Sequence, residues 1–400
     1  MKYLMVTDIP TPWRETVHEI VHHRLGDDFH VVYCKDNEKK RLWTFRHGNH
    51  PKTLLKALTF KFRGTERFLN VGIFPFILRH RPSVVVCFAL DPTIILAFLA
   101  SKIIRAKIVF LYDSWAGREL GINLLQKTAR KVTFTRVVDV FIGASKQTLE
   151  LYKHYNPKLN PDSLFLSWLC ADNDFFLKAM QENPQPRDYD IMFSGRIVKL
   201  KNPAFFARIA IEVKKKIGHC RVLIIGDGDP DLKNQMFQEL REGDVDFTYE
   251  GFVKHERLPE LYCRAKLLLL PTSMDCWGVV INEAMVSGTP VITTAMTAAA
   301  GELVKHGVNG LVLPMKEDEW VAHTASLLSD PEKLTVMADA ARKDVASFTF
   351  ENAAEGMIGA IEYAEKLGKT GRNCNRRKLS SPNRCLTMLL HEPSSRSDRE

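Results

Sequence analysis

The chain has 400 residues, of which 45% are hydrophobic and 26% charged, and its formal net charge is +9. This composition excludes a natively disordered chain, and the length predicts two domains because one hydrophobic core seldom extends over so many residues. Residues 366–400 carry nine Lys or Arg against three Asp or Glu, a net of +6, which leaves +3 for the other 365 residues.

The cysteines and the apolar segments indicate the cellular compartment in which the protein folds. Eight cysteines are scattered singly without a CxxC pair, which favours a reducing environment. The N-terminus lacks the basic and apolar regions of a signal peptide. The most apolar region, Val84–Ile104, is interrupted by Asp91 and Pro92, so its pieces are shorter than the ~20 residues of a membrane-spanning helix. We therefore expect a cytoplasmic protein that could also lie at the inner face of the plasma membrane.

Short β-branched runs alternate with helical patterns along the chain, which is typical of parallel sheets covered by helices. The predicted strands of the first half are Tyr3–Val6, Val31–Tyr33, Val84–Phe88, Ile108–Tyr112 and Val138–Ala144. Those of the second half are Asp190–Phe193, Arg221–Ile225, Val245–Glu250, Leu267–Leu270 and Val291–Thr293. The pattern predicts an α/β protein with two doubly wound, Rossmann-like domains.

Breaks in this pattern set the predicted boundaries. We expect an N-terminal domain over 1–175, a linker over 176–189, a C-terminal domain over 190–347, a helix over 348–365 that could pack back on the N-terminal domain, and a disordered basic tail over 366–400. The linker is placed where strand and helix periodicity both fail between Asp172 and Asp190.

The segment Pro51–Arg81 combines many leucines and phenylalanines with seven Lys or Arg and almost no acidic residues. Two interpretations stay open. Such a segment can lie on an anionic membrane surface, or it can be an amphipathic helix packed on the first sheet with its lysines in water. We expect no nucleic acid partner, because no recognition motif accompanies the charge.

A strand, a loop and a helix follow one another around Asp275–Gly278. Such a loop lies at the carboxyl end of a parallel strand, where α/β sheets bind ligands. Gly278 allows close approach by a phosphate, and the helix that follows offers free backbone N–H groups. Asp275 and Glu283 are placed so that both carboxylates could accept hydrogen bonds from sugar hydroxyls. Either acid alone could equally be a solvated or helix-terminal charge.

The segment Asp275–Met285, with the sequence DCWGVVINEAM, resembles the signature of glycosyltransferase family 4. That signature has two acidic residues separated by seven positions, although the first is usually Glu, so Asp275 is one methylene shorter. The resemblance implies the GT-B fold, with two Rossmann-like domains facing a central cleft, and retaining transfer of a sugar from a nucleoside diphosphate. It assigns Glu283 to the ribose, Asp275 to hydroxyls of the transferred sugar, and Trp277, Gly278, Val279 and Val280 to the diphosphate.

A second motif of the family is similar to Phe193–Pro203. Arg196 can bind a phosphate through two parallel hydrogen bonds and Lys201 adds a point charge, so the pair would neutralise the leaving nucleoside diphosphate without a metal. Lys199 competes with Lys201 for this role. Solvated surface charges are the alternative for both cations.

Three further assignments follow from the resemblance. The backbone of Phe252 and Val253 is expected to meet the nucleotide base. Arg14 follows a Pro-Thr-Pro-aromatic sequence similar to that of bacterial cell-surface polysaccharide transferases, and it is a candidate for donor or acceptor binding or simply for packing at a helix start. Asp113 ends a strand where many members place a histidine.

We expect no metal and no cofactor beyond the donor, because Asp227 and Asp229 flank a glycine in what is more simply a turn than a metal motif. The resemblance predicts a hexosyltransferase-type, metal-independent enzyme that passes a sugar from a nucleotide sugar to a glycan or lipid-linked acceptor in cell-surface polysaccharide synthesis. A catalytically inactive nucleotide-sugar-binding protein and a nucleotide-sugar epimerase of the same fold are the alternatives.

Overall fold

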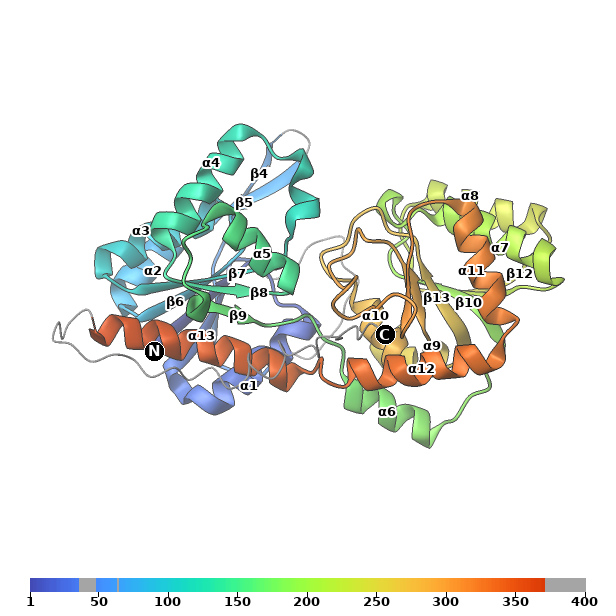
Figure 1. Cartoon of the computed structure of the whole chain (residues 1–400). Helices are drawn as coiled ribbons and strands as arrows, with labels where there is room; N and C mark the ends of the chain where they lie inside the picture. The colour runs from blue at the N-terminus through green and yellow to red at the C-terminus, as the bar shows by residue number, and fades with distance from the viewer. Residues whose placement is uncertain (36–47, 63–64, 371–400) are drawn as a thin grey trace, which may run out of the picture.

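The computed structural model describes residues 1–35, 48–62 and 65–370, and contains two parallel sheets with helices on both faces (Figure 1). The first sheet has the strand order β3-β2-β1-β6-β7-β8-β9, and the second has the order β12-β11-β10-β13-β14-β15. The predicted fold class, an α/β protein with two parallel-sheet domains, is confirmed.

The bounds of the strands are as follows. The first sheet contains β1 (Tyr3–Thr7), β2 (Phe29–Tyr33), β3 (Lys52–Leu54), β6 (Val84–Phe88), β7 (Lys107–Tyr112), β8 (Val140–Gly143) and β9 (Leu164–Leu166). The antiparallel hairpin is β4 (Leu58–Phe62) and β5 (Thr65–Leu69). The second sheet contains β10 (Tyr189–Ser194), β11 (Arg221–Ile225), β12 (Asp246–Gly251), β13 (Ala265–Leu270), β14 (Val291–Thr293) and β15 (Gly310–Val312).

The α-helices of the first half are α1 (Pro12–Leu25), α2 (Ile73–His80), α3 (Pro92–Ile104), α4 (Leu124–Val132), α5 (Lys146–Tyr155) and α6 (Asn173–Glu182). Those of the second half are α7 (Pro203–Ile217), α8 (Pro230–Glu242), α9 (Leu258–Tyr262), α10 (Val279–Val286), α11 (Glu317–Leu328), α12 (Pro331–Val345) and α13 (Phe350–Thr370). Helices α3, α8 and α12 each begin with Asp followed by Pro, because the Asp side chain accepts free backbone N–H groups and Pro has none to leave unpaired.

All ten predicted strands are present, and the three parallel strands that the sequence did not predict lie at sheet edges. Strands β3, β9 and β15 have three residues each. So short a run carries too little period-two pattern to stand out from a loop.

The segment Pro51–Arg81 is not the amphipathic helix that one interpretation proposed. It contains β3, the hairpin and α2, so only Ile73–His80 is helical. Residues 58–62, Leu-Thr-Phe-Lys-Phe, alternate apolar and polar side chains, and this period of two matches a strand rather than a helix.

The expectation that helix periodicity fails after Asp172 is wrong for the first part of the predicted linker, because α6 occupies Asn173–Glu182. The Asp172 carboxylate accepts the Phe175 backbone N–H at 3.0 Å and caps the helix. Phe176 is fully buried and lies edge-on to Tyr262 of the second half. One buried aromatic residue is a weak signal for a ten-residue helix.

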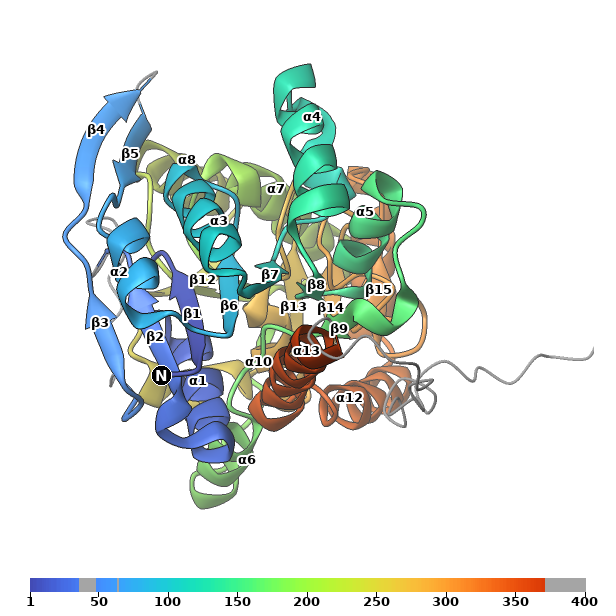
Figure 2. The ribbon, with the colours of Figure 1, turned by 90° about the vertical axis from the view of Figure 1, so that its left-hand side faces the viewer.

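Helix α13 leaves the second half and lies beneath the first sheet beside α1, as both views show (Figures 1 and 2). The Tyr3 hydroxyl donates to Glu365 at 2.5 Å, and Gly356 packs directly against the backbone of Leu166. The helix continues through Lys366–Thr370, the start of the predicted tail, and residues 371–400 lie outside the described part of the chain.

The two halves share one continuous apolar core. The ring of Phe348 lies 5.2 Å from that of Trp168 and 5.7 Å from that of Trp277, so an aromatic row joins the end of the first half to the loop after β13. Burial of this row stabilises a fixed placement of the two sheets.

Candidate functional site

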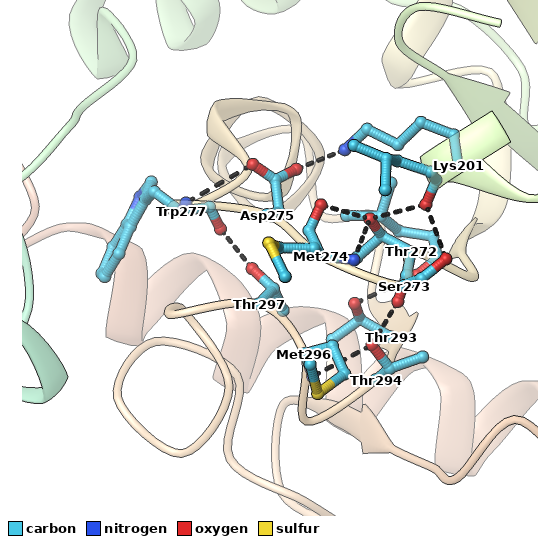
Figure 3. Close-up of polar contacts among 12 residues, drawn as sticks. Lys201, Thr272, Ser273, Met274, Asp275, Trp277, Thr293, Thr294, Met296 and Thr297 are labelled. Atoms are coloured by element: carbon cyan, nitrogen blue, oxygen red, sulfur yellow. Dashed lines mark hydrogen bonds and ion pairs between the residues drawn. The ribbon is translucent and has the colours of Figure 1, made fainter. Parts of the chain in front are cut away.

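The site is built where β10 and β13, neighbours in the second sheet, end at the same edge. The Leu200 carbonyl accepts the Ser273 backbone N–H at 2.8 Å and the Thr272 hydroxyl at 3.1 Å (Figure 3). The Asn202 amide donates to the Pro271 carbonyl at 2.7 Å. These bonds hold the two predicted motifs, which are some 75 residues apart in sequence, against each other.

Lys201 and Asp275 form the ion pair at the centre of this contact (Figure 3). Their side chains are 15% and 21% exposed, so both remain accessible from solvent. The second oxygen of Asp275 lies 3.5 Å from the backbone nitrogen of Trp277. The structure thus brings the predicted lysine to the predicted acid, and Lys199 is an exposed neighbour without this contact.

Gly278 is required at the start of α10 by its backbone conformation. Its φ of 87° lies in the left-handed region that favours glycine, and a Cβ there would lie 3.4 Å from the Asp275 carboxylate. No side chain caps α10, so its first backbone N–H groups have no side-chain acceptor, and the positive end of the helix dipole lies beside Lys201 and Asp275.

Glu283 lies on the second turn of α10 and accepts a hydrogen bond from the Tyr262 hydroxyl at 2.7 Å. The same hydroxyl lies 2.6 Å from Ser194, at the end of β10. Burial raises the pKa of Glu283 to about 7, and the Tyr262 bond opposes that rise by stabilising the carboxylate.

Glu283 lines a cavity of about 390 Å³ that lies between the two halves of the molecule. Its size is within the range of small-molecule sites. The predicted residues Phe252, Val253 and Val279 also line it. The remaining lining residues come from α1, the crossover before α6, the loop before α9, the start of α9, and α13: Pro12, Trp13, Thr16, Cys170, Ala171, Asp172, Lys254, His255, Glu256, Leu258 and Phe350.

The other predicted residues lie outside this lining. Arg196 is exposed on the loop after β10 and makes no hydrogen bond or ion pair with any residue that the structure describes. Val280 is half-buried. The indole of Trp277 is fully buried and donates to Asn282 at 2.8 Å, so only its backbone faces the loop.

Arg14 is buried, with 7% of its surface exposed, and is not among the residues that line the cavity. Its guanidinium donates to the Ser167 hydroxyl at 3.0 Å and to the Ser167 carbonyl at 3.3 Å. This contact ties α1 to the end of β9, which is the helix-start packing that the sequence left as an alternative.

Two aromatic residues of the site were not predicted. Trp13 lines the cavity beside Arg14, and Tyr262 holds Glu283. Trp13 is the aromatic residue of the Pro-Thr-Pro-aromatic sequence before Arg14, and Tyr262 ends α9. The direction of each side chain depends on tertiary packing, which the sequence pattern does not give.

The first half also contacts the loops that follow β13 and β14. The Trp115 indole donates to the Asp275 carbonyl at 2.9 Å. Glu302 accepts the Trp168 indole N–H and the Lys146 backbone N–H, both at 2.7 Å. The loop that carries Asp275 is therefore positioned by both halves of the chain.

Within the described residues, one group offers a set of ligands that could hold a metal: Glu15, His18 and His50, all buried in the first half. Each is within hydrogen-bonding distance of the Tyr33 hydroxyl, which lies between them. The Asp-Gly-Asp turn has a different role, because Asp229 caps α8 and Asp227 pairs with Lys233 at 2.7 Å.

The second half of the chain is similar in sequence to known proteins. Residues 175–344 match the family model "Glycosyl transferases group 1". The matched range contains both motifs of the site and the whole second sheet. The chain is 28% identical over 188 residues to D-inositol 3-phosphate glycosyltransferase of Rhodococcus opacus, and the match covers 45% of this chain and 42% of that protein.

The chain is also 28% identical over 174 residues to alpha-D-kanosaminyltransferase of Streptomyces kanamyceticus, covering 42% of this chain and 44% of that protein. The matched part of the chain thus spans less than half the length of these curated relatives.

The solved structures extend the likeness to nearly the whole chain. HepE of Anabaena, in complex with UDP, has a TM-score of 0.67 at 16% identity and covers 92% of this chain and 100% of its own. WaaG, a glycosyltransferase involved in lipopolysaccharide biosynthesis, has a TM-score of 0.65 at 13% identity and covers 90% of this chain and 99% of its own. The fold is therefore GT-B, as the sequence resemblance implied.

Proposed function

We propose that this chain is a retaining glycosyltransferase of family 4 that moves a hexose from a nucleoside diphosphate to a glycan or lipid-linked acceptor in cell-surface polysaccharide synthesis. The observation that carries the proposal is the joining of Lys201, Asp275 and Gly278 at the start of α10, next to a cavity lined by Glu283. The group 1 match over 175–344 and the GT-B fold support it.

Each part of the donor has a complementary group in this arrangement. The Glu283 carboxylate suits the ribose hydroxyls, and Phe252 and Val253, the residues proposed to meet the base, line the same cavity. The start of α10 suits the diphosphate. A uracil base is the first choice, because the HepE structure contains UDP.

Breaking the bond between the sugar and the donor leaves a second negative charge on the terminal phosphate of the departing diphosphate. Lys201 and the dipole of α10 lie where they can stabilise that charge, and exposed Arg196 can add a two-pronged hydrogen bond. We infer that the donor phosphate replaces Asp275 as the partner of Lys201, which leaves Asp275 to bind hydroxyls of the sugar. The departing phosphate then accepts the proton of the incoming hydroxyl on the same face of the sugar. These cations make the proposed transfer metal-independent.

Donor hydrolysis and transfer by the purified protein, measured with a panel of nucleotide sugars, tests the proposal. We expect sugar release with at least one UDP-sugar, and we expect Arg196→Ala to lower that rate about a hundredfold to a thousandfold. Binding without turnover would favour an inactive nucleotide-sugar-binding protein. Release of an altered nucleotide sugar without acceptor would favour an epimerase.

A further inference from the structure

Helix α4 projects from the first sheet in both views (Figures 1 and 2). Its leucine side chains are exposed to solvent. Leu124 and Leu125 are 80% and 77% exposed, the two highest values among large hydrophobic residues of the described chain. No α4 residue is buried, and the main neighbour of the helix is the turn Thr133–Val137 that continues it. Two adjacent leucines so exposed on a helix without a packing partner indicate a surface that is covered by something else.

The charge around these leucines has one sign. Residues 124–137 contain no Asp or Glu, and Lys127, Lys131 and Arg136 are exposed. The fourth base, Arg130, turns inward and pairs with Glu119 at 3.1 Å. The outward face of α4 is therefore both apolar and cationic.

The neighbouring helix extends the apolar part of this face. Ile95, Leu99 and Ile103 recur every four residues along α3, and they are 50%, 53% and 62% exposed. Helix α3 packs on β6 and β7 of the first sheet, and α4 projects on the same side of that sheet. The β4–β5 hairpin reaches the same end of the molecule in both views (Figures 1 and 2). Leu58 on that hairpin is 61% exposed.

We propose that α4, together with the exposed stripe of α3, docks on an anionic lipid bilayer. The leucines lie on the convex surface of a projecting helix with lysines beside them, an arrangement that inserts apolar groups between headgroups while the ammonium groups meet lipid phosphates. Since the described residues contain no helix long and apolar enough to cross a membrane, the contact is with its surface.

This surface differs from the one that the sequence indicated. Much of Pro51–Arg81 forms strand β3 and the hairpin, and neither α3 nor α4 belongs to that segment. The proposal does not rest on the proposed sugar transfer, because bilayer binding needs neither a donor nor catalysis.

Flotation of the full chain with lipid vesicles tests the proposal. We expect binding to phosphatidylcholine vesicles that contain phosphatidylglycerol, no binding to phosphatidylcholine alone, and release by high salt. The double variant Leu124→Glu/Leu125→Glu should lower partitioning about tenfold or more, and Lys127→Glu should lower it by about fivefold or more. Both variants should keep the wild-type circular dichroism spectrum, because the side chains are in water.

Val336→Glu is the matched control, since Val336 is 65% exposed on α12 of the other half, and it should bind vesicles like the wild type. Equal partitioning of the double leucine variant and the wild type would overturn the proposal, as would failure of the wild type to bind anionic vesicles. A wild-type dimer that becomes a monomer in the leucine variant would assign the face to a second copy of the chain instead.

Discussion

Lys201 and Asp275 form an ion pair, although each is a candidate to bind a different part of the donor. A pair that is 15% and 21% exposed contributes about 1 kcal/mol or less to folding, so the protein loses little stability when a ligand separates the two charges. This makes the pair suited to exchange one partner for a phosphate.

From this we predict that Lys201→Ala lowers kcat/KM for donor turnover about a hundredfold or more, while the melting temperature changes little. Lys199→Ala is the control, because Lys199 is exposed two positions away and does not contact Asp275. Steady-state kinetics of both variants decide the matter, and equal losses in the two would count against a specific role of Lys201.

The raised pKa of Glu283 gives a second prediction. Below about pH 7 its carboxyl becomes protonated and loses acceptor capacity for ribose hydroxyls, so donor affinity should fall about tenfold per pH unit as the pH decreases. For the ligand-free protein the sign is opposite. A pKa raised on folding means that protonation of Glu283 stabilises the fold, and this contribution is lost as the pH rises through about 7.

Calorimetric titration with UDP at pH values on both sides of 7, for the wild type and for Glu283→Gln, distinguishes protonation of Glu283 from protonation of UDP itself. The variant should bind more weakly at high pH and show a flatter profile. Identical pH profiles in both proteins would refute the assignment of Glu283 to the ribose.

Among the elements, α13 has the clearest role, since it leaves the second half and packs beneath the first sheet. Its glycines show where the contact is closest. A Cβ on Gly356 would lie 1.6 Å from the Leu166 carbonyl oxygen of β9, whereas a Cβ on Gly368 would meet only the Lys107 side chain at 3.6 Å. The first contact involves backbone and cannot relax without moving the helix or the strand.

We therefore predict that Gly356→Ala lowers the free energy of unfolding by about 2 kcal/mol or more. Gly368→Ala lies on the same helix and should be neutral or stabilising by up to about 1 kcal/mol, because alanine favours a helix over glycine. Urea unfolding monitored by circular dichroism gives the free energy of unfolding of both variants and of the wild type. Equal stabilities of the two variants would mean that α13 does not pack as closely as described.

How far the sequence predicted these elements depends on their length and burial. The central strands of both sheets are buried along their length, and several of them, such as β6 and β13, are runs rich in Val or Leu, so all of them were predicted. Strands β3, β9 and β15 were not, because three residues at a sheet edge carry little pattern. Helix α6 was missed because its packing against Tyr262 is a long-range contact.

The site divides in the same way. Lys201, Asp275, Gly278 and Glu283 belong to two local motifs, and motif spacing was sufficient to select them. The cavity residues of the first half could not be selected from the sequence, because successive residues of a helix point about 100° apart. In the structure Trp13 lines the cavity and Arg14 binds Ser167. Which of the two neighbours faces a ligand is decided by packing against β9.

At the scale of the whole molecule, the two sheets are held together around the cavity. Helix α13, the aromatic row through Phe348, and the bonds of Trp115 and Glu302 all cross between the halves. A ligand in this cavity contacts both domains at once, so its binding stabilises their joint arrangement by mass action.

The central claim is that the second half holds a nucleoside diphosphate through cations and the start of α10. Thermal stability measured with UDP and with uridine, for the wild type and for Arg196→Ala/Lys201→Ala, tests it most directly. We expect a clear stabilisation of the wild type by UDP, a much smaller one by uridine, and loss of this difference in the double variant. Equal effects of UDP on the two proteins, or none on the wild type, would contradict it.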